Sequence, residues 1–229
     1  MSRIAQCALL FHLAASGATA AEPIGILFDF GNPPENSVVD LMKSEIRNIL
    51  APAQLELTFQ RLDRVQQTSK FRKIVIVRFR GECQERGDWS QLELTASPML
   101  DYPALGKTAI SNGEVLPDVQ IYCNEVRAFV PPVSRLPFAE LYGRALGRVV
   151  VHELYHALLS TRDHTRGGVA RFSQSARDLT RSKLSLDAES IGRLKALYGP
   201  RHTALLNEKE GGPSEPPSIG QYFPSELGP

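Results

Sequence analysis

The sequence has no excess of either charge and no long apolar run beyond its N-terminal segment. Its 229 residues include 26 lysine and arginine residues against 25 aspartate and glutamate residues, a formal net charge of +1. This balance lacks the basic excess typical of nucleic-acid-binding proteins, so we expect no nucleic-acid partner. No later segment approaches the roughly 20 apolar residues that a membrane helix needs, so we also expect no membrane span. The length suits one sizeable domain.

The first residues have the order of a secretory signal peptide. Arg3 supplies an early positive charge, an apolar run covers residues 8–15, and Ala18-Thr19-Ala20 forms a small-residue cleavage pattern. This order predicts cleavage after Ala20, with Ala21 as a close alternative, and therefore a secreted or periplasmic protein. An ordinary buried helix is the alternative interpretation of the same segment.

The remaining chain divides into one domain and a tail. With the signal peptide assigned to residues 1–20, we expect one domain over 21–206 and a disordered tail over 207–229. The tail is rich in proline, glycine, glutamate and serine and has little that could form a core.

Cysteine is scarce, with three residues in the whole chain. Cys7 lies in the predicted signal peptide, which leaves Cys83 and Cys123. In an oxidising compartment two such cysteines commonly form a disulfide, which we predict here. Two buried free thiols are the alternative.

The spacing of apolar residues predicts several strands followed by helices. The order of elements predicts an α+β domain in which a mixed sheet packs against a long helix and a C-terminal helix follows. A turn-rich stretch is expected over 98–117. Strands are predicted over 24–31, 55–62, 73–81, 91–97 and 119–130, the last with a turn of helix at its end, and helices over 35–50, 138–160 and 184–199.

Histidine is also scarce, yet three of the five histidines fall within thirteen residues. His152 and His156 enclose Glu153 in the pattern H-E-x-x-H. On a helix the two histidines lie one turn apart on the same face, where both can reach one tetrahedral Zn²⁺. Glu153, rotated by about 100° from His152, then lies beside the metal and can deprotonate a metal-activated water.

A catalytic zinc needs a third protein ligand and one open position. We predict His164 as this ligand, because it follows the predicted helix end on a loop that can fold back. Asp163 beside it would then orient a ligand rather than bind the metal. Glu189 would suit a pattern in which a glutamate of the next helix binds zinc, but its neighbours are typical of a first helical turn. The candidates weighed are His164, Asp163, Asp187, Glu189 and His202.

These residues resemble the metzincin zinc peptidases, and among them the matrixin-like enzymes. Their signature is H-E-x-x-H-x-x-G-x-x-H, followed by a methionine turn. The segment "HALLSTRDHT" (156–165) shares the beginning and the end of the matrixin pattern, with two additional residues between them. The segment "LSLDAESIGRLKALYG" (184–199) has the frame of their last helix. The resemblance covers 141–199 and implies a metzincin-like zincin fold, Zn²⁺ as cofactor and a peptide or protein substrate lying along a sheet edge.

The chain departs from the family pattern at two places. Leu159 stands where the family has a glycine that turns the chain after the motif helix. Val169 or Ala170 stands where the methionine is expected. In the family this methionine packs beneath the metal without binding it, so zinc binding is still expected.

Together these observations predict an exported, monomeric zinc metalloendopeptidase. His152, His156 and His164 would hold Zn²⁺, and Glu153 would act as general base and then pass the proton to the leaving amine. One alternative is a non-catalytic binding module whose fold is stabilised by zinc. Another is a zinc hydrolase that acts on a non-peptide amide.

Overall fold

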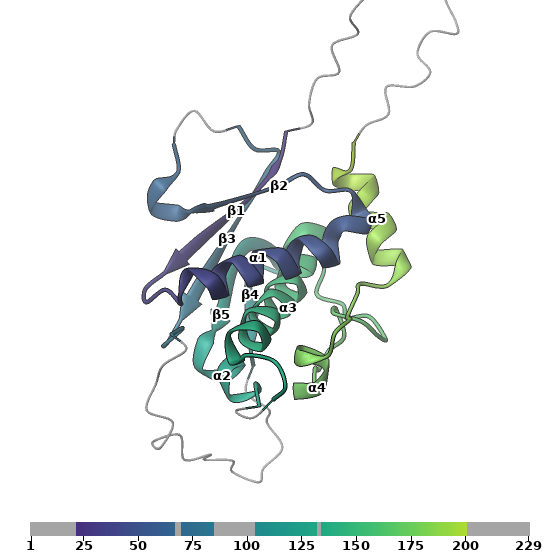
Figure 1. Ribbon diagram of the computed structural model, residues 1–229. Helices are drawn as coiled ribbons and strands as arrows, with labels where there is room; N and C mark the ends of the chain where they lie inside the picture. The colour runs from purple at the N-terminus through teal and green to yellow at the C-terminus, as the bar shows by residue number, and fades with distance from the viewer. Residues whose placement is uncertain (1–21, 67–69, 85–103, 132–133, 201–229) are drawn as a thin grey trace, which may run out of the picture.

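The computed structural model describes residues 22–66, 70–84, 104–131 and 134–200 (Figure 1). These residues form a five-stranded mixed sheet with helices packed on it, so the predicted combination of mixed sheet and helices is confirmed. The predicted signal peptide, the predicted strand over 91–97 and the predicted tail lie outside the described residues.

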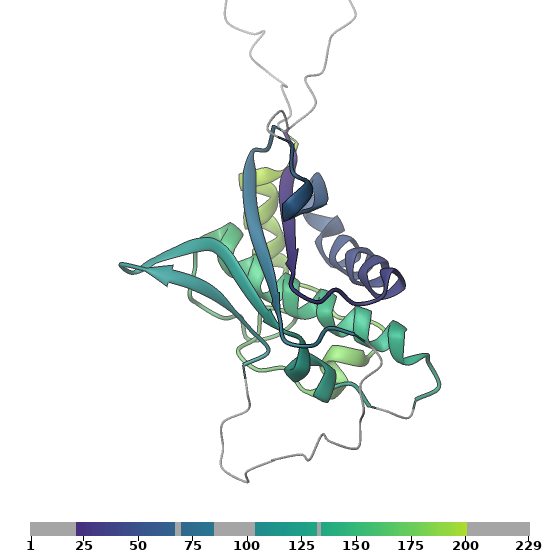
Figure 2. The ribbon, with the colours of Figure 1, turned by 90° about the vertical axis from the view of Figure 1, so that its left-hand side faces the viewer.

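The sheet has the strand order β2-β1-β3-β5-β4. The first four strands in this order run parallel, and only β4 runs antiparallel to its neighbour β5. Figure 2 shows the β4–β5 hairpin extending beyond the rest of the sheet. The strands are β1 (Ile24–Phe30), β2 (Leu57–Arg61), β3 (Lys73–Arg80), β4 (Gly106–Ser111) and β5 (Glu114–Tyr122).

The two faces of the sheet differ in polarity. In β3, Val75 and Val77 are fully buried whereas Ile74 is 41% exposed, the alternation expected of a strand with one face in the core. On the opposite face Arg78 forms ion pairs with Asp29 at 3.1 Å and with Asp118 at 2.9 Å. The apolar face is therefore the one that packs against the helices.

Helix α3 (Phe138–Leu159) carries the histidine motif and packs along α1 (Asn36–Leu50) (Figure 1). Two glycines allow the close approach. A Cβ atom at Gly143 would lie 2.7 Å from Leu41 Cβ, and one at Gly147 would lie 2.8 Å from Glu45 Cβ. The remaining helices are α2 (Cys123–Ala128), α4 (Ala176–Thr180) and α5 (Ala188–Tyr198), with 3-10 turns at Ala51–Ala53 and Leu62–Arg64.

The structure confirms most of the predicted elements and adds two. The stretch predicted to be turn-rich contains β4 and the first half of β5, joined at Asn112 and Gly113, which have φ of 50° and 83°. The strand predicted to reach residue 130 ends at Tyr122, where α2 begins. The short helix α4 was not predicted. No helix among the described residues has the length and apolar character that crossing a membrane requires.

The predicted disulfide between Cys83 and Cys123 is confirmed. It joins the segment after β3 to the first residue of α2, and both cysteines are fully buried. The bond therefore ties the central strand to the segment that leads into α3.

Candidate metal centre

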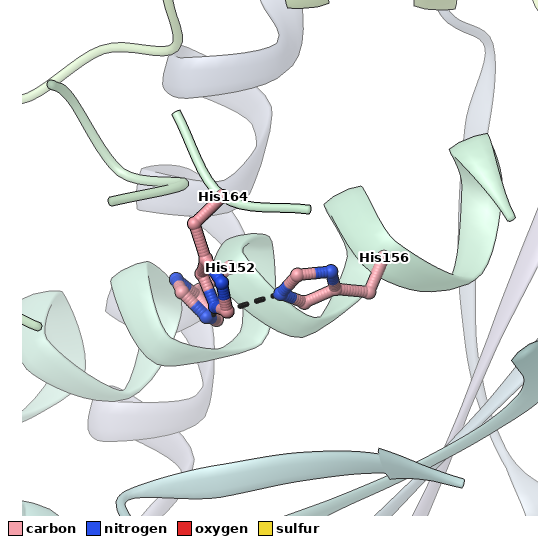
Figure 3. Close-up of side chains that lie close together, drawn as sticks. All are labelled: His152, His156 and His164. Atoms are coloured by element: carbon pink, nitrogen blue, oxygen red, sulfur yellow. Dashed lines mark hydrogen bonds between the residues drawn. The ribbon is translucent and has the colours of Figure 1, made fainter. Parts of the chain in front are cut away.

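Three histidines converge at the C-terminal half of α3. His152 and His156 lie one turn apart on the helix, and His164 returns to them from the following loop (Figure 3). The candidate ligand atoms of the three side chains all lie within 4.8 Å of one another. The Nε2 atoms of His152 and His156 are 3.3 Å apart. Two nitrogens bound to one tetrahedral zinc at about 2.0–2.1 Å would be separated by roughly 3.3 Å.

Backbone carbonyls determine which nitrogen of each helical histidine is free. His152 Nδ1 lies 2.9 Å from the carbonyl oxygen of Val169, and His156 Nδ1 lies 2.8 Å from that of Thr161. A carbonyl oxygen can only accept a hydrogen bond, so each Nδ1 carries the proton and donates. The Nε2 atoms of the neutral rings are then unprotonated, and their lone pairs face the same point.

The three rings are uncharged at neutral pH. Burial lowers the pKa of His152 to about 4, and it also lowers the pKa of His156 and of His164. Two neutral nitrogens with no proton between them repel one another unless a cation lies between them. The donor set therefore fits a metal ion, and three imidazoles suit Zn²⁺ in particular.

The chain turns toward the metal centre at Ser160. Leu159, at the position of the glycine in the metzincin pattern, is still helical and buried. Ser160 ends the helix in the left-handed region, with φ 49° and ψ 44°, and its N–H and that of Thr161 both donate to His156 O. The turn thus comes one residue later than in the family pattern, and a serine makes it.

A buried backbone turn supports His152 from below. Val169 and Ala170, where the family has its methionine, are both fully buried. The Val169 carbonyl accepts a hydrogen bond from His152 and another from Gln174 Nε2, and Ala170 O accepts from Thr165 N at 3.0 Å. The Val169 carbonyl therefore orients the His152 ring, and the same turn binds Thr165, the residue after His164, through Ala170 O.

Gly168 allows this turn to form. Its φ is 74°, and a Cβ atom there would lie 2.4 Å from the carbonyl oxygen of Ser185. That carbonyl accepts a hydrogen bond from Val169 N at 2.9 Å. Any larger residue would therefore collide with the Ser185 carbonyl. The collision would disturb the hydrogen bond from Val169 N and so move the Val169 carbonyl, which orients His152.

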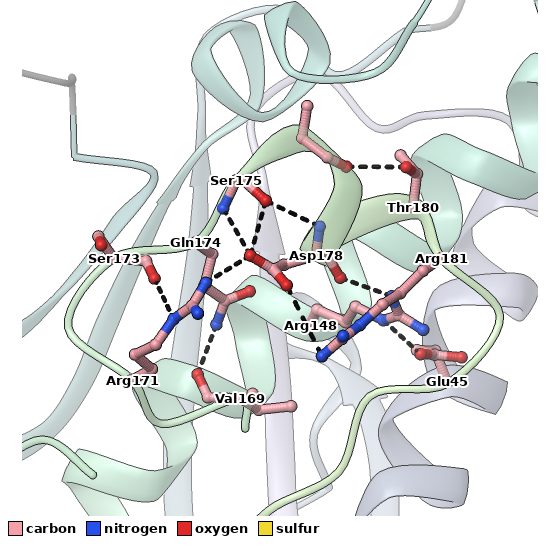
Figure 4. A network of polar contacts seen from close by, with 11 residues as sticks. Glu45, Arg148, Val169, Arg171, Ser173, Gln174, Ser175, Asp178, Thr180 and Arg181 are labelled. Atoms are coloured by element: carbon pink, nitrogen blue, oxygen red, sulfur yellow. Dashed lines mark hydrogen bonds and ion pairs between the residues drawn. The ribbon is translucent and has the colours of Figure 1, made fainter. Parts of the chain in front are cut away.

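A polar network joins the segment after the turn to α3 (Figure 4). Arg148, fully buried and one turn before His152, donates to Glu45 Oε1 and to Asp178 O, both at 2.7 Å. The Asp178 carboxylate accepts hydrogen bonds from Ser175 and from Arg171. The bonds from Ser175 contribute most to lowering the pKa of Asp178 to about 2, so this group stays ionised. The residues lining one side of the site are therefore held to the motif helix.

Glu153 lies beside the histidines and contacts the edge strand β4. It is 6% exposed, and Thr108 Oγ1 donates to its Oε2 at 2.7 Å. Burial raises the pKa of Glu153 to about 7, and the hydrogen bond from Thr108 opposes this rise. Gly106 leaves room for the Glu153 side chain, because a Cβ atom at Gly106 would lie 3.0 Å from Glu153 Cγ. Next to these contacts, the pairing of β4 with β5 shifts register between Thr108 and Ile110.

An open cleft of about 1010 Å³ contains these groups. Its lining includes the three histidines, Glu153, the β4 strand and the segment 171–176. Phe172 is 79% exposed at this cleft, and its ring centroid lies 5.1 Å from that of His164. The space is large enough for several residues of a peptide.

Of the other predicted third ligands, those that the structure describes have different partners. Asp187 caps α5 by accepting hydrogen bonds from the N–H and hydroxyl of Ser190. Glu189 is exposed in the first turn of α5. Asp163 bonds to Thr161, and its charge partly offsets the lowered pKa of His156 and His164. His202 lies outside the described residues.

Sequence reasoning did not identify the roles of Thr108, Gly106 and Arg148. Thr108 and Gly106 belong to a strand that was not predicted. Arg148 was placed on the motif helix without any indication that it is buried.

Comparison with known proteins gives a likeness to solved structures but no match by sequence. No protein-family model matches the sequence, and no curated protein matches it. Among solved structures, the chain is similar to archaemetzincin from Methanopyrus kandleri, with 16% sequence identity and a TM-score of 0.45, over 80% of this chain and 98% of that chain.

Replacing Ser160 by glycine should stabilise the protein. A non-glycine residue in the left-handed region costs about 1 kcal/mol, and glycine removes most of that cost. We expect Ser160→Gly to raise the free energy of unfolding by about 0.5 kcal/mol in urea denaturation. The matched control is Ser44→Gly on the exposed side of α1, which should lower it by about 0.5 kcal/mol. Equal losses in both variants would contradict the assigned turn.

Replacing Gly168 by alanine should weaken metal binding. The new methyl group meets Ser185 O and displaces the Val169 carbonyl, so we expect a 10–100-fold loss of Zn²⁺ affinity and a loss of about 2–4 kcal/mol in stability. Competition with a chromogenic chelator measures the affinity. Gly167→Ala is the control, because a Cβ atom at Gly167 meets nothing within 4 Å. Unchanged affinity in Gly168→Ala would show that the turn does not orient His152.

Proposed function

We propose that the protein is an exported zinc metalloendopeptidase of the metzincin type, close to the matrixins in its motif. The observation that carries this proposal is a buried carboxylate, Glu153, beside three neutral imidazoles in an open cleft. His152, His156 and His164 are the proposed ligands of Zn²⁺.

The number of ligands favours a catalytic site over a structural one. Structural zinc sites are closed by four protein ligands, whereas catalytic sites have three and one open position. Among the described residues, the cluster consists of three histidines and opens onto the cleft. This argues against a module in which zinc only stabilises the fold.

The chemistry divides between the metal and the carboxylate. A zinc ion held by the three imidazoles would make a bound water nucleophilic near neutral pH and would polarise the carbonyl of the scissile bond. Glu153 accepts the proton of the attacking water at a carboxylate oxygen and then delivers it to the nitrogen of the leaving amine. Thr108 donates to Glu153 Oε2 and so holds the carboxylate in one orientation for both transfers.

The central experiment compares the wild type with Glu153→Gln on a broad library of acetylated and amidated peptides. We expect the variant to retain stoichiometric zinc, measured by atomic absorption, and to lose at least about 10³-fold in kcat/KM, since it cannot accept a proton. A wild type that binds zinc but cleaves no peptide in the library would refute the proposed peptidase activity.

The ligand assignment has a separate test. We expect His164→Ala to lower zinc affinity by at least about 10²-fold, because two histidines alone remain. Glu189→Ala is the matched control and should bind zinc as the wild type does. The opposite ranking would move the third ligand to Glu189.

Removal of the Thr108 hydroxyl should slow the reaction without affecting the metal. We expect Thr108→Val to lower kcat about tenfold with little change in KM or zinc content, because the carboxylate loses its orienting donor. Thr108→Ser keeps the hydroxyl and should restore most of the rate. In a Glu153→Gln background, Thr108→Val should have no further effect on the residual rate. An additive loss there would mean that Thr108 acts independently of Glu153.

A further inference from the structure

We propose that the cleft selects peptides with acidic side chains next to the bond that is cut. This inference rests on the proposed function and names the substrate class of the same site. It comes from the distribution of charge around the cleft, which the catalytic chemistry does not require.

The charged side chains that line the cleft are mostly cationic. Among the described residues, the lining contains Lys107, Arg162 and Arg171, against one acidic residue, Glu153. Glu153 is buried and is assigned to proton transfer, so it does not screen the outer part of the cleft. A bound Zn²⁺ would add two further positive charges to the cleft.

Arg171 already has partners within the fold. Its Nε donates to Ser173 O at 2.7 Å, and it forms an ion pair with Asp178. Its charge is thus largely used to hold the segment 171–176. It contributes less to recognition than the two other cations do.

Lys107 and Arg162 are available to a ligand. Both are exposed, and within the described ranges neither forms an ion pair or a side-chain hydrogen bond. Asp163, next to Arg162, bonds instead to Thr161 and does not line the cleft. Among the described residues, the two cations therefore have no ion-pair partner that a substrate would have to displace.

Lys107 belongs to β4 and Arg162 to the loop after α3, and each is close in sequence to residues of the proposed catalytic centre. Lys107 stands between Gly106 and Thr108, both of which approach Glu153. Arg162 stands on the loop between His156 and His164. Lys107 pairs with Gln120 and Thr108 with the buried Val119, so Lys107 projects from the face of the edge strand β4 opposite to Thr108. A peptide that lies along β4 would place alternate side chains on that face and would pass the loop that carries Arg162, so acidic residues next to the scissile bond would meet opposite charge.

The preference can be measured by binding as well as by cleavage. Acetylated and amidated peptides, identical except for Glu, Gln or Lys at the residues flanking the scissile bond, are titrated into zinc-loaded Glu153→Gln and cleaved by the wild type. We expect the Glu peptide to exceed the Gln peptide about tenfold in affinity and in kcat/KM, and the Lys peptide by more. In 1 M NaCl most of this difference should disappear, because salt screens exposed charges.

Charge reversal identifies the residues responsible. In Lys107→Glu/Arg162→Glu the order of the Glu and Lys peptides should reverse. Arg162→Glu alone should narrow the preference for the Glu peptide, and Arg166→Glu is its matched control, since Arg166 is exposed on the same loop, two residues beyond His164, and does not line the cleft. It should keep the wild-type order. An equal shift in the control would assign the effect to net charge and overturn the proposal.

The outcomes separate this inference from the proposed function. Charge-selective binding without cleavage would overturn the peptidase activity and retain the selective cleft. Cleavage with no preference among the three peptides would overturn the selective cleft and retain the peptidase. Selectivity that appears only when peptides have a free C-terminus would assign the cations to a terminal carboxylate and overturn selection by side chains.

Discussion

The hydrogen bond from His152 to the Val169 carbonyl joins the two halves of the site. His152 belongs to a rigid, buried helix, whereas Val169 belongs to a turn in the segment after it. Without this bond the ring could rotate about its χ angles, and its Nε2 would no longer face that of His156. Several other contacts bring the same segment back to α3, including those from Arg148 to Asp178 O and from Tyr198 to Leu158 O. Helix α3 thus positions the segments that follow it in the described chain through these hydrogen bonds.

The sheet contributes to the other side of the site through its antiparallel edge. The edge strand β4 runs antiparallel to β5 and contacts α3, where Thr108 donates a hydrogen bond to Glu153. The pairing with β5 shifts register between Thr108 and Ile110, just beyond this contact, and irregularities of this kind are common next to active sites. The proposed base is therefore held between a helix that carries it and a strand that orients it.

Local patterns in the sequence were sufficient to predict the elements with strong periodicity. The motif helix, α1 and β3 were placed correctly because their apolar residues repeat at helical or strand spacing over many residues. The grouping of His164 with the two helical histidines followed from closeness in sequence and is present in the structure. Assignment of these histidines as ligands remains a prediction that the zinc measurements address.

Sequence patterns were insufficient where the structure depends on contacts between distant residues. The strand β4 is short, begins at a glycine and carries polar residues, so its own composition resembled a loop. Its pairing with β5 and the contact of Thr108 with a residue 45 positions away stabilise it. The burial of Arg148 could not be predicted either. A charged residue on a helix is normally exposed unless it has a partner such as Glu45, which is distant in sequence.

The missing glycine and methionine show which features of the pattern the geometry requires. The turn after the motif helix needs one residue in the left-handed region, and with two additional residues in the loop Ser160 provides it at some conformational cost. On the side of the turn, His152 needs a fixed hydrogen-bond acceptor and well-packed neighbours. The backbone carbonyl of Val169 is the acceptor, and the small aliphatic side chains of Val169 and Ala170 are buried there. His152 bonds to the backbone of Val169 and not to its side chain, so the side chain can change as long as Gly168 keeps the Val169 carbonyl in place. The orientation of His152 therefore depends here on backbone conformation more than on the identity of the side chains in the turn.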